Sequence, residues 1–93
     1  MMSEIKQGNH QFYLGDDEEN AIAYVTFKDK DDSTIIVDHT FVSDELRGQG
    51  IAGKLYKRII DYAREENKKI IPECPYIKTK MEQNKADQDL LAE

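Results

Sequence analysis

The sequence has little of what a disulfide framework, a zinc site or a nucleic-acid-binding surface needs. It holds a single cysteine, Cys74, which excludes an internal disulfide, and only two histidines. Neither a C-x-x-C nor an H-x-x-x-H spacing occurs, so we expect no metal site. Lysine and arginine number 13 against 19 aspartates and glutamates, for a formal net charge of -6. This balance argues against a nucleic-acid partner and is compatible with a cationic one.

Long apolar stretches are also missing. The first residues, MMSEIKQGNHQFYL, carry neither the basic nor the apolar segment of a signal peptide. Apolar runs are only a few residues long, so we expect no membrane-spanning helix. Together with the single cysteine, these features favour a reducing, cytoplasmic setting. No repeat and no linker rich in proline, glycine or serine is evident, and the length of 93 residues predicts one domain over residues 1–93.

The hydrophobic pattern of the first half is that of strands. Residues 10–14, 20–28 and 34–42 are rich in aromatic, β-branched or other apolar side chains, and polar turns at 15–19 and 29–33 separate them. Strands joined by short polar turns predict an antiparallel meander.

In the second half the period changes to that of a helix. From residue 51 to residue 67 apolar side chains recur at helical spacing, namely Ala52, Leu55, Tyr56, Ile59, Ile60 and Ala63. Residues 68–74 then form a short predicted strand, and a strand–helix–strand crossover predicts that it lies parallel to the third strand. Pro75 suits the first turn of a second, short helix. The charged tail either docks through Leu90 and Leu91 or frays.

The stretch ELRGQGIAGKL, residues 45–55, joins the third strand to the long helix and contains three glycines. A loop that feeds a helix N-terminus presents unpaired N–H groups to an anion, and glycine lets the backbone approach closely. Gly48, Gly50 and Gly53 match the dinucleotide fingerprint G-x-G-x-x-G, with Glu73 about 20 residues further on. Against this, SDELR separates the strand from the first glycine, and the chain has room for only one βαβ unit.

Two other interpretations of the glycines differ in their consequences. A Walker loop is excluded, because no Gly-Lys-Ser/Thr occurs. A tight strand-to-helix turn without any ligand stays open. The remaining interpretation is the spacing R-x-x-G-x-A at Arg47, Gly50 and Ala52. It resembles the acyl-CoA-binding signature Q/R-x-x-G-x-G/A of the GNAT (GCN5-related) acetyltransferase superfamily.

The resemblance extends over about residues 9–92 and points to a small stand-alone branch of that superfamily. The branch has an H-T pair in one strand and C-P-F/Y after the last strand, matched here by His39-Thr40 and by Cys74-Pro75-Tyr76. It implies an α+β fold, a truncated GNAT-like acyl-CoA N-acyltransferase fold with a mixed sheet. The sheet is an antiparallel meander plus one parallel strand, with one main helix and a short C-terminal helix. The two N-terminal helices and extra C-terminal strands of the usual fold, parts of which shape the acceptor site, are missing.

The resemblance also implies a site. Backbone amides of the loop hold the CoA pyrophosphate, in the stretch formed by Arg47, Gly48, Gln49, Gly50, Ile51 and Ala52. Phe41 and Val42 hydrogen-bond the pantetheine arm and the acyl carbonyl, and the strand with Glu73 and Cys74 splays away to admit them. The implied function is transfer of an acetyl group from acetyl-CoA to an amine, with the amine and the oligomeric state left open. The alternative is a non-catalytic acetyl-CoA-binding or protein-interaction module.

Few side chains are available for the chemistry of acyl transfer, which needs a proton for the leaving thiolate and a neutral amine. Cys74 is a candidate proton donor or nucleophile, or else a small buried hydrophobe. His39 is a candidate base by its ordinary pKa, or else a hydrogen-bonded strand residue. Strand alternation places His39 with Val37 and Phe41 unless a bulge shifts the parity. Tyr76 could be an acid by family resemblance, but its spacing favours core packing.

Overall fold

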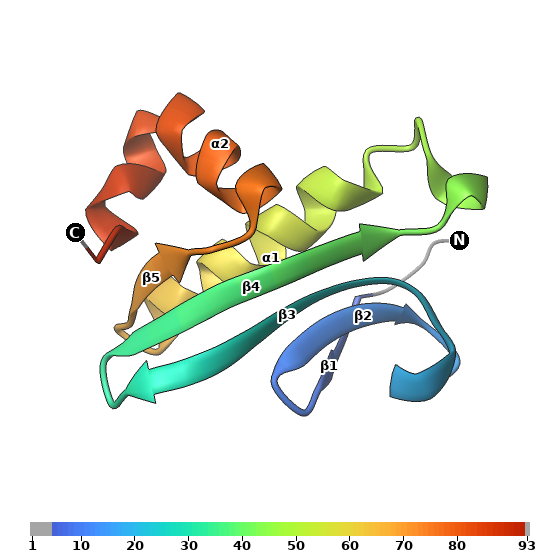
Figure 1. Ribbon diagram of the computed structural model, residues 1–93, viewed down its shortest axis with the longest axis horizontal. Helices are drawn as coiled ribbons and strands as arrows, with labels where there is room; N and C mark the ends of the chain where they lie inside the picture. The colour runs from blue at the N-terminus through green and yellow to red at the C-terminus, as the bar shows by residue number, and fades with distance from the viewer. Residues whose placement is uncertain (1–4, 93) are drawn as a thin grey trace.

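The computed structural model describes residues 5–92, which form a five-stranded sheet and two α-helices (Figure 1). The elements are β1 (Lys6–Gly8), β2 (Gln11–Gly15), β3 (Ala21–Asp31), β4 (Thr34–Val42), α1 (Ile51–Glu65), β5 (Lys69–Pro72) and α2 (Pro75–Gln83). Short 3-10 turns lie at η1 (Glu18–Asn20), η2 (Asp44–Leu46) and η3 (Lys85–Leu90). The strands lie in chain order, β1 to β4 antiparallel and β5 parallel to β4. This confirms the predicted mixed α+β sheet and rules out a dinucleotide-binding fold.

The sequence does not predict β1. Its residues are polar and show no alternation, yet Lys6 pairs with Tyr13 and Gly8 with Gln11 across a two-residue turn. The turn contains no glycine, and His10 takes the left-handed conformation at φ 60° instead. The meander therefore has four strands rather than three, because the short edge strand is defined by its partner and not by its own pattern.

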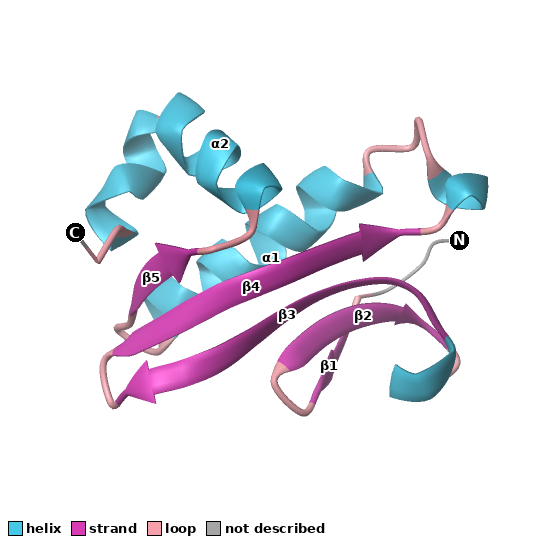
Figure 2. Cartoon of the chain, viewed as in Figure 1, coloured by secondary structure: helices cyan, strands magenta, loops and turns pink. Residues whose placement is uncertain are grey.

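One face of the sheet forms the core with α1, which runs behind β4 in the view of Figure 2. Ala23, Val25 and Phe27 of β3 are buried there, as the alternation of that strand predicts. Leu55 and Ile59 of α1 are fully buried against them, and each such side chain stabilises the fold by about 1.5–3 kcal/mol. From α2, Ile77 and Met81 join the same hydrophobic cluster.

The ends of α1 and of the chain agree closely with the sequence pattern. The helix begins at Ile51, and Asn67 terminates it in the left-handed conformation at φ 57°. The tail docks: Leu90 is buried, Leu91 bridges to Ile70 of β5, and the amide of Ala92 donates to the Ile70 carbonyl at 3.0 Å. Within residues 5–92, no helix has the length and apolarity to cross a membrane.

The parity of β4 changes at Asp38. Val37 pairs with Phe27 but His39 pairs with Thr26, so Asp38 is the extra residue of a β-bulge. The plain alternation that grouped His39 with Val37 is therefore wrong. Val37 is buried in the core, whereas His39 is exposed on the opposite face, beside Tyr24.

Candidate functional site

β4 and β5 separate half-way along β4. Their last pair is Val37 with Pro72, and β4 continues alone to Val42 (Figure 1). Beyond Pro72, the amides of Glu73 and Cys74 both donate to the Val37 carbonyl at 3.0 Å, and the next residue begins α2. The predicted strand over 68–74 is thus shorter, and residues 38–42 of β4 have one unpaired side, which we call the free edge.

The backbone groups at the free edge follow from the pairing on the other side. The Ser43 amide donates to the Ile22 carbonyl of β3 at 2.8 Å. Because neighbouring residues of an antiparallel strand alternate in the direction of their N–H and C=O groups, Phe41 faces β3 while Thr40 and Val42 face the free edge. An extended ligand with peptide-like amides can pair with such an edge as an added strand does.

The loop after β4 ends in an open approach to the start of α1. Gly48 and Gly50 have φ of 84° and 75°, which favours glycine, and a Cβ built on either would meet no atom within 4 Å. Helix α1 has no side-chain N-cap and no acidic residue in its first turn. Since Lys54 makes the first helical bond, to the Gly50 carbonyl at 3.2 Å, the amides before it have no partner within the helix. This geometry suits an anion.

A pocket of about 460 Å³ lies where the loop meets the end of β4. It is lined by Val42, Leu46, Arg47, Gly48, Gly50, Ile51, Ala52, Gly53 and Tyr76, and we call it the loop pocket. Its volume is in the range of small-molecule sites, roughly 300–1,000 Å³. Most of the residues that the sequence predicts for CoA binding therefore surround one space.

Two of the predicted binding residues lie elsewhere. The Phe41 side chain is 40% exposed and contacts the Tyr24 ring on the outer face of the sheet. Gln49 points its side-chain amide to the Glu45 carbonyl at 3.4 Å. Arg47 lines the loop pocket, and its guanidinium forms an exposed ion pair with a neighbouring aspartate of η2 at 3.1 Å.

Tyr76 lies at the loop pocket and also packs against the hydrophobic core, as its spacing in the sequence favours. Its hydroxyl oxygen is 4.0 Å from the position that a Cβ on Gly53 would take. Burial raises the pKa of Tyr76, and the nearby Cys74 raises it further. The phenol therefore keeps its proton at neutral pH. The C-P-Y triplet was the available sequence signal, because the proline sets the first turn of α2 and Tyr76 follows it directly.

The two predicted catalytic residues lie on opposite sides of the sheet. Cys74 is buried at the point of separation, and its thiol donates to Thr40 Oγ1 at 3.3 Å. His39 is exposed on the outer face, with its ring centroid 5.9 Å from that of Tyr24. The structure thus brings Cys74 close to Tyr76 and does not bring His39 to either of them.

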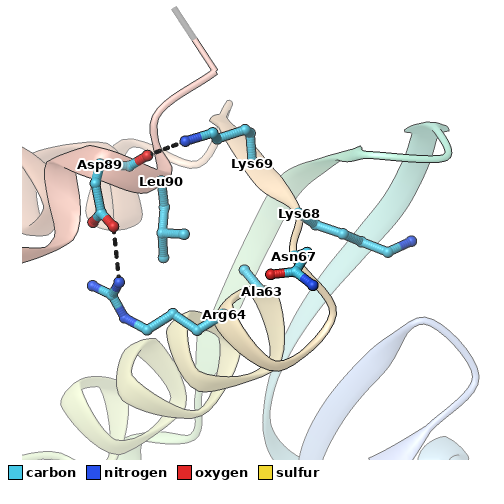
Figure 3. Close-up of a pocket in the computed structure, with 7 residues that line it drawn as sticks. All are labelled: Ala63, Arg64, Asn67, Lys68, Lys69, Asp89 and Leu90. Atoms are coloured by element: carbon cyan, nitrogen blue, oxygen red, sulfur yellow. Dashed lines mark hydrogen bonds and ion pairs between the residues drawn. The ribbon is translucent and has the colours of Figure 1, made fainter.

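A second cavity, of about 370 Å³, lies at the other end of α1, between that helix, β5 and the tail (Figure 3). Its cations are held by the chain itself. Arg64 donates to Asp89 at 3.0 Å, Lys69 donates to the Asp89 carbonyl, and Lys68 lies 3.7 Å from an aspartate of β3. Arg64 holds the pKa of Asp89 below its ordinary value. The residues around this cavity connect α1 to the tail through hydrogen bonds and ion pairs, and we assign the cavity no ligand.

Comparison with known proteins decides the family. The sequence model of the GCN5-related N-acetyl-transferase family matches residues 11–90. The chain belongs to this family. A GCN5-like candidate N-acetyltransferase from Staphylococcus aureus, solved by NMR, is 49% identical over 95% of this chain and 86% of its own, with a TM-score of 0.79. The resemblance to the GNAT superfamily drawn from the loop and from the C-P-Y triplet is confirmed.

Two larger relatives carry bound ligands. The GNAT family N-acetyltransferase YhbS from Escherichia coli, in complex with CoA, is 25% identical over 67% of this chain and 38% of its own, with a TM-score of 0.56. A GNAT family acetyltransferase from Elizabethkingia anophelis with acetyl-CoA bound shares the fold, at 18% identity over 78% of this chain and 50% of its own and a TM-score of 0.58. This chain spans half or less of both proteins. A comparison with curated proteins found no match.

Proposed function

We propose that the protein is an N-acetyltransferase that binds acetyl-CoA in the loop pocket and transfers its acetyl group to an amine. The observation that carries this proposal is the junction of an uncapped helix start with the free edge of β4 in one pocket. The family supports it, and so do the CoA and acetyl-CoA bound to the two larger relatives.

The pyrophosphate of acetyl-CoA fits the start of α1. The amides of Ile51 and Ala52 and the positive end of the helix dipole attract an anion, and the open space over Gly48 and Gly50 lets it approach the backbone. Arg47 adds a guanidinium at the pocket rim, which is free to exchange its exposed aspartate for a phosphate oxygen.

The pantetheine arm carries amides of its own and fits the free edge of β4. The backbone groups of Thr40 and Val42 point there, and Val42 also lines the loop pocket. Phe41 has no part in this contact, because its backbone faces β3 and its side chain lies on the outer face. The proposed binding residues therefore differ at this position from the pair that the family resemblance implies.

Tyr76 is the proton donor in this proposal. A thiolate leaves readily only when it gains a proton, and the Tyr76 hydroxyl at the pocket wall stays protonated because burial raises its pKa. Cys74 forms part of the wall. Its thiol is buried and donates to Thr40, and burial in apolar surroundings disfavours the thiolate that a nucleophile needs.

Titration calorimetry with acetyl-CoA tests the site. In Gly50→Asp a carboxylate would stand where the pyrophosphate binds, so we expect affinity to fall by about a hundredfold or more. The matched control is Gly50→Ala, which shares the backbone strain of a positive φ but adds no charge. Equal losses in the two variants would trace the effect to strain and remove the support for a phosphate site.

A non-catalytic acetyl-CoA-binding module is the second candidate. One observation favours it: among the described residues, the wall of the loop pocket contains no histidine, aspartate or glutamate to act as a base. Release of CoA from acetyl-CoA in the presence of a panel of primary amines distinguishes the two functions. Binding without release by any amine would establish the module over the enzyme.

A further inference from the structure

We infer that the outer face of the sheet binds the acetyl acceptor and that this acceptor is a lysine-rich polypeptide segment. The outer face is the one opposite α1. The inference rests on the proposed acetyl transfer, and it adds the class of acceptor and the surface that receives it.

Three aromatic residues at paired positions of neighbouring strands form a stripe across this face. Tyr13 of β2 pairs with Tyr24 of β3, and Tyr24 pairs with Phe41 of β4. The rings of Tyr24 and Phe41 are 5.3 Å apart between centroids. We call these three residues the aromatic stripe. It spans three strands, about 10 Å at some 4.8 Å per strand, which is long enough for several residues of an extended segment.

The stripe is open to a partner. Among the described residues, the large hydrophobic side chains that remain exposed are Ile22 at 41% and Phe41 at 40%, and they lie in β3 and β4, two of the three strands that carry the stripe. Tyr13 and Tyr24 are only half-buried. Aromatic faces of this kind bind ammonium and guanidinium groups and the aliphatic stems that carry them.

Charge selects the partner. At the β2 end of the stripe, Tyr13 lines a hollow together with Asp17, Glu18 and Glu19. None of these three carboxylates forms an ion pair within residues 5–92. With a net charge of -6 on the whole chain, the long-range field also draws in a cationic partner. Asp17 accepts hydrogen bonds from the amides of Glu19 and Asn20, and Glu18 accepts one from the amide of Asn9, so these carboxylates are held in place without a cationic partner. An aromatic surface that ends in such carboxylates fits lysine side chains.

The stripe leads to the reaction site. Its β4 end, Phe41, directly precedes Val42, which lines the loop pocket at the free edge. The loop pocket lies on the α1 side of the sheet, so a segment lying on the stripe, with cationic groups at the β2 end, would reach the proposed acetyl group by passing a further lysine around the free edge of β4. His39, exposed beside Tyr24, stands next to that path.

Fluorescence anisotropy of a labelled lysine–serine repeat peptide tests the surface. The comparison peptide has glutamate in place of lysine, and unlabelled butylamine tests whether a free amine competes. We expect Phe41→Ser to weaken binding of the lysine peptide about tenfold and Glu19→Lys about threefold. The matched control, Glu65→Lys, makes the same charge change on an exposed position of α1 and should leave binding unchanged. Circular dichroism shows whether each variant is folded.

The outcomes separate this inference from the proposed function, because acetyl-CoA affinity is measured on the same samples by calorimetry. Acetyl-CoA binding without lysine-peptide binding overturns the acceptor surface and leaves the cofactor site standing. Equal binding of both peptides, full competition by butylamine at the peptide's own concentration, or equal effects of Glu19→Lys and Glu65→Lys also overturn it. A dimer in sizing experiments that Phe41→Ser dissociates would assign the face to a second copy instead.

Discussion

The two halves of β4 belong to one continuous strand and have different surroundings. The amino-terminal half, up to Val37, pairs with β3 on one side and with β5 on the other, and Ile35 and Val37 are fully buried. The carboxyl-terminal half, residues 38–42, pairs with β3 alone. The amino-terminal half is β-branched throughout, whereas the carboxyl-terminal half is more polar and contains Asp38, His39 and Thr40. The candidate site exists because the neighbouring strand ends early.

The bulge at Asp38 marks the boundary between the halves. Asp38 accepts a hydrogen bond from Thr26 at 2.7 Å, which fixes the extra residue on the outer face. Because of this extra residue, the side chains of β4 beyond Asp38 divide between two surfaces. Thr40 lies on the α1 side, next to Cys74, and His39 and Phe41 lie on the outer face.

The largest expected effect comes from Tyr76, the proposed proton donor at the loop pocket beside the carboxyl-terminal half of β4. Tyr76→Phe should lower the rate of acetyl transfer about a hundredfold while acetyl-CoA affinity stays the same, because only the proton is lost. The control is Tyr62→Phe, a tyrosine packed against Phe12 and Phe27 in the core. Steady-state CoA release measures both variants, and Cys74→Ala should retain most of the wild-type rate.

The pH dependence sharpens this prediction. A raised pKa means that Tyr76 loses its proton only above the ordinary tyrosine value of 10.0. The rate should therefore show no loss attributable to this donor between neutral pH and pH 10, and it should fall above that range. A large rate loss in Cys74→Ala, with Tyr76→Phe unaffected, would transfer the role of donor to the thiol.

Paired valine substitutions compare the two halves directly. Val37→Ala should destabilise the protein by about 2–3 kcal/mol, since it removes methyl groups from a fully buried position. Val42→Ala makes the same change at a half-buried position beside the loop pocket and should cost less than about 1 kcal/mol. Urea denaturation followed by circular dichroism measures both. Similar losses would show that the free edge is as tightly packed as the paired half.

Amide hydrogen exchange tests the free edge itself. The amides of Thr40 and Val42 should exchange faster than those of Phe41 and Ser43, which face β3. Saturating acetyl-CoA should slow Thr40 and Val42 about tenfold or more, because a bound pantetheine would pair with them. Protection of these two amides before acetyl-CoA is added would argue against an unpaired edge.

The smallest effect is expected at the tail, which supports β5 beside the paired half. Arg64→Met removes the bonds to Asp87 and Asp89 and should speed exchange of the Ala92 amide a few-fold, with little change at the loop pocket. Lowering the pH should also speed exchange of the Ala92 amide. Because Arg64 lowers the pKa of Asp89, this contact is complete above the ordinary value of 3.8 and is lost as the pH falls through the lowered value. Lys57→Met, on the exposed face of α1, is the control.

Several features follow from the sequence by itself. The helical stretch of α1, its termination by Asn67 just beyond Glu65, and the strand over 34–42 are local features. Helical spacing, a left-handed terminator and a β-branched run are visible within a few residues of chain. The glycines of the loop are local as well, since each position of positive φ is occupied by a residue that accepts it. The family follows from the same loop and from the triplet that begins at Cys74.

The tertiary structure decided the rest, because register and strand length depend on residues far apart in the chain. The bulge that moves His39 away from Val37 is a mismatch between β3 and β4, and neither strand shows it alone. β1 is a strand only because β2 pairs with it. Tyr76 reaches the loop pocket because β5 ends at Pro72 and α2 turns back toward the start of α1. A sequence pattern reports what a side chain prefers, and only the packed chain determines which side chains meet.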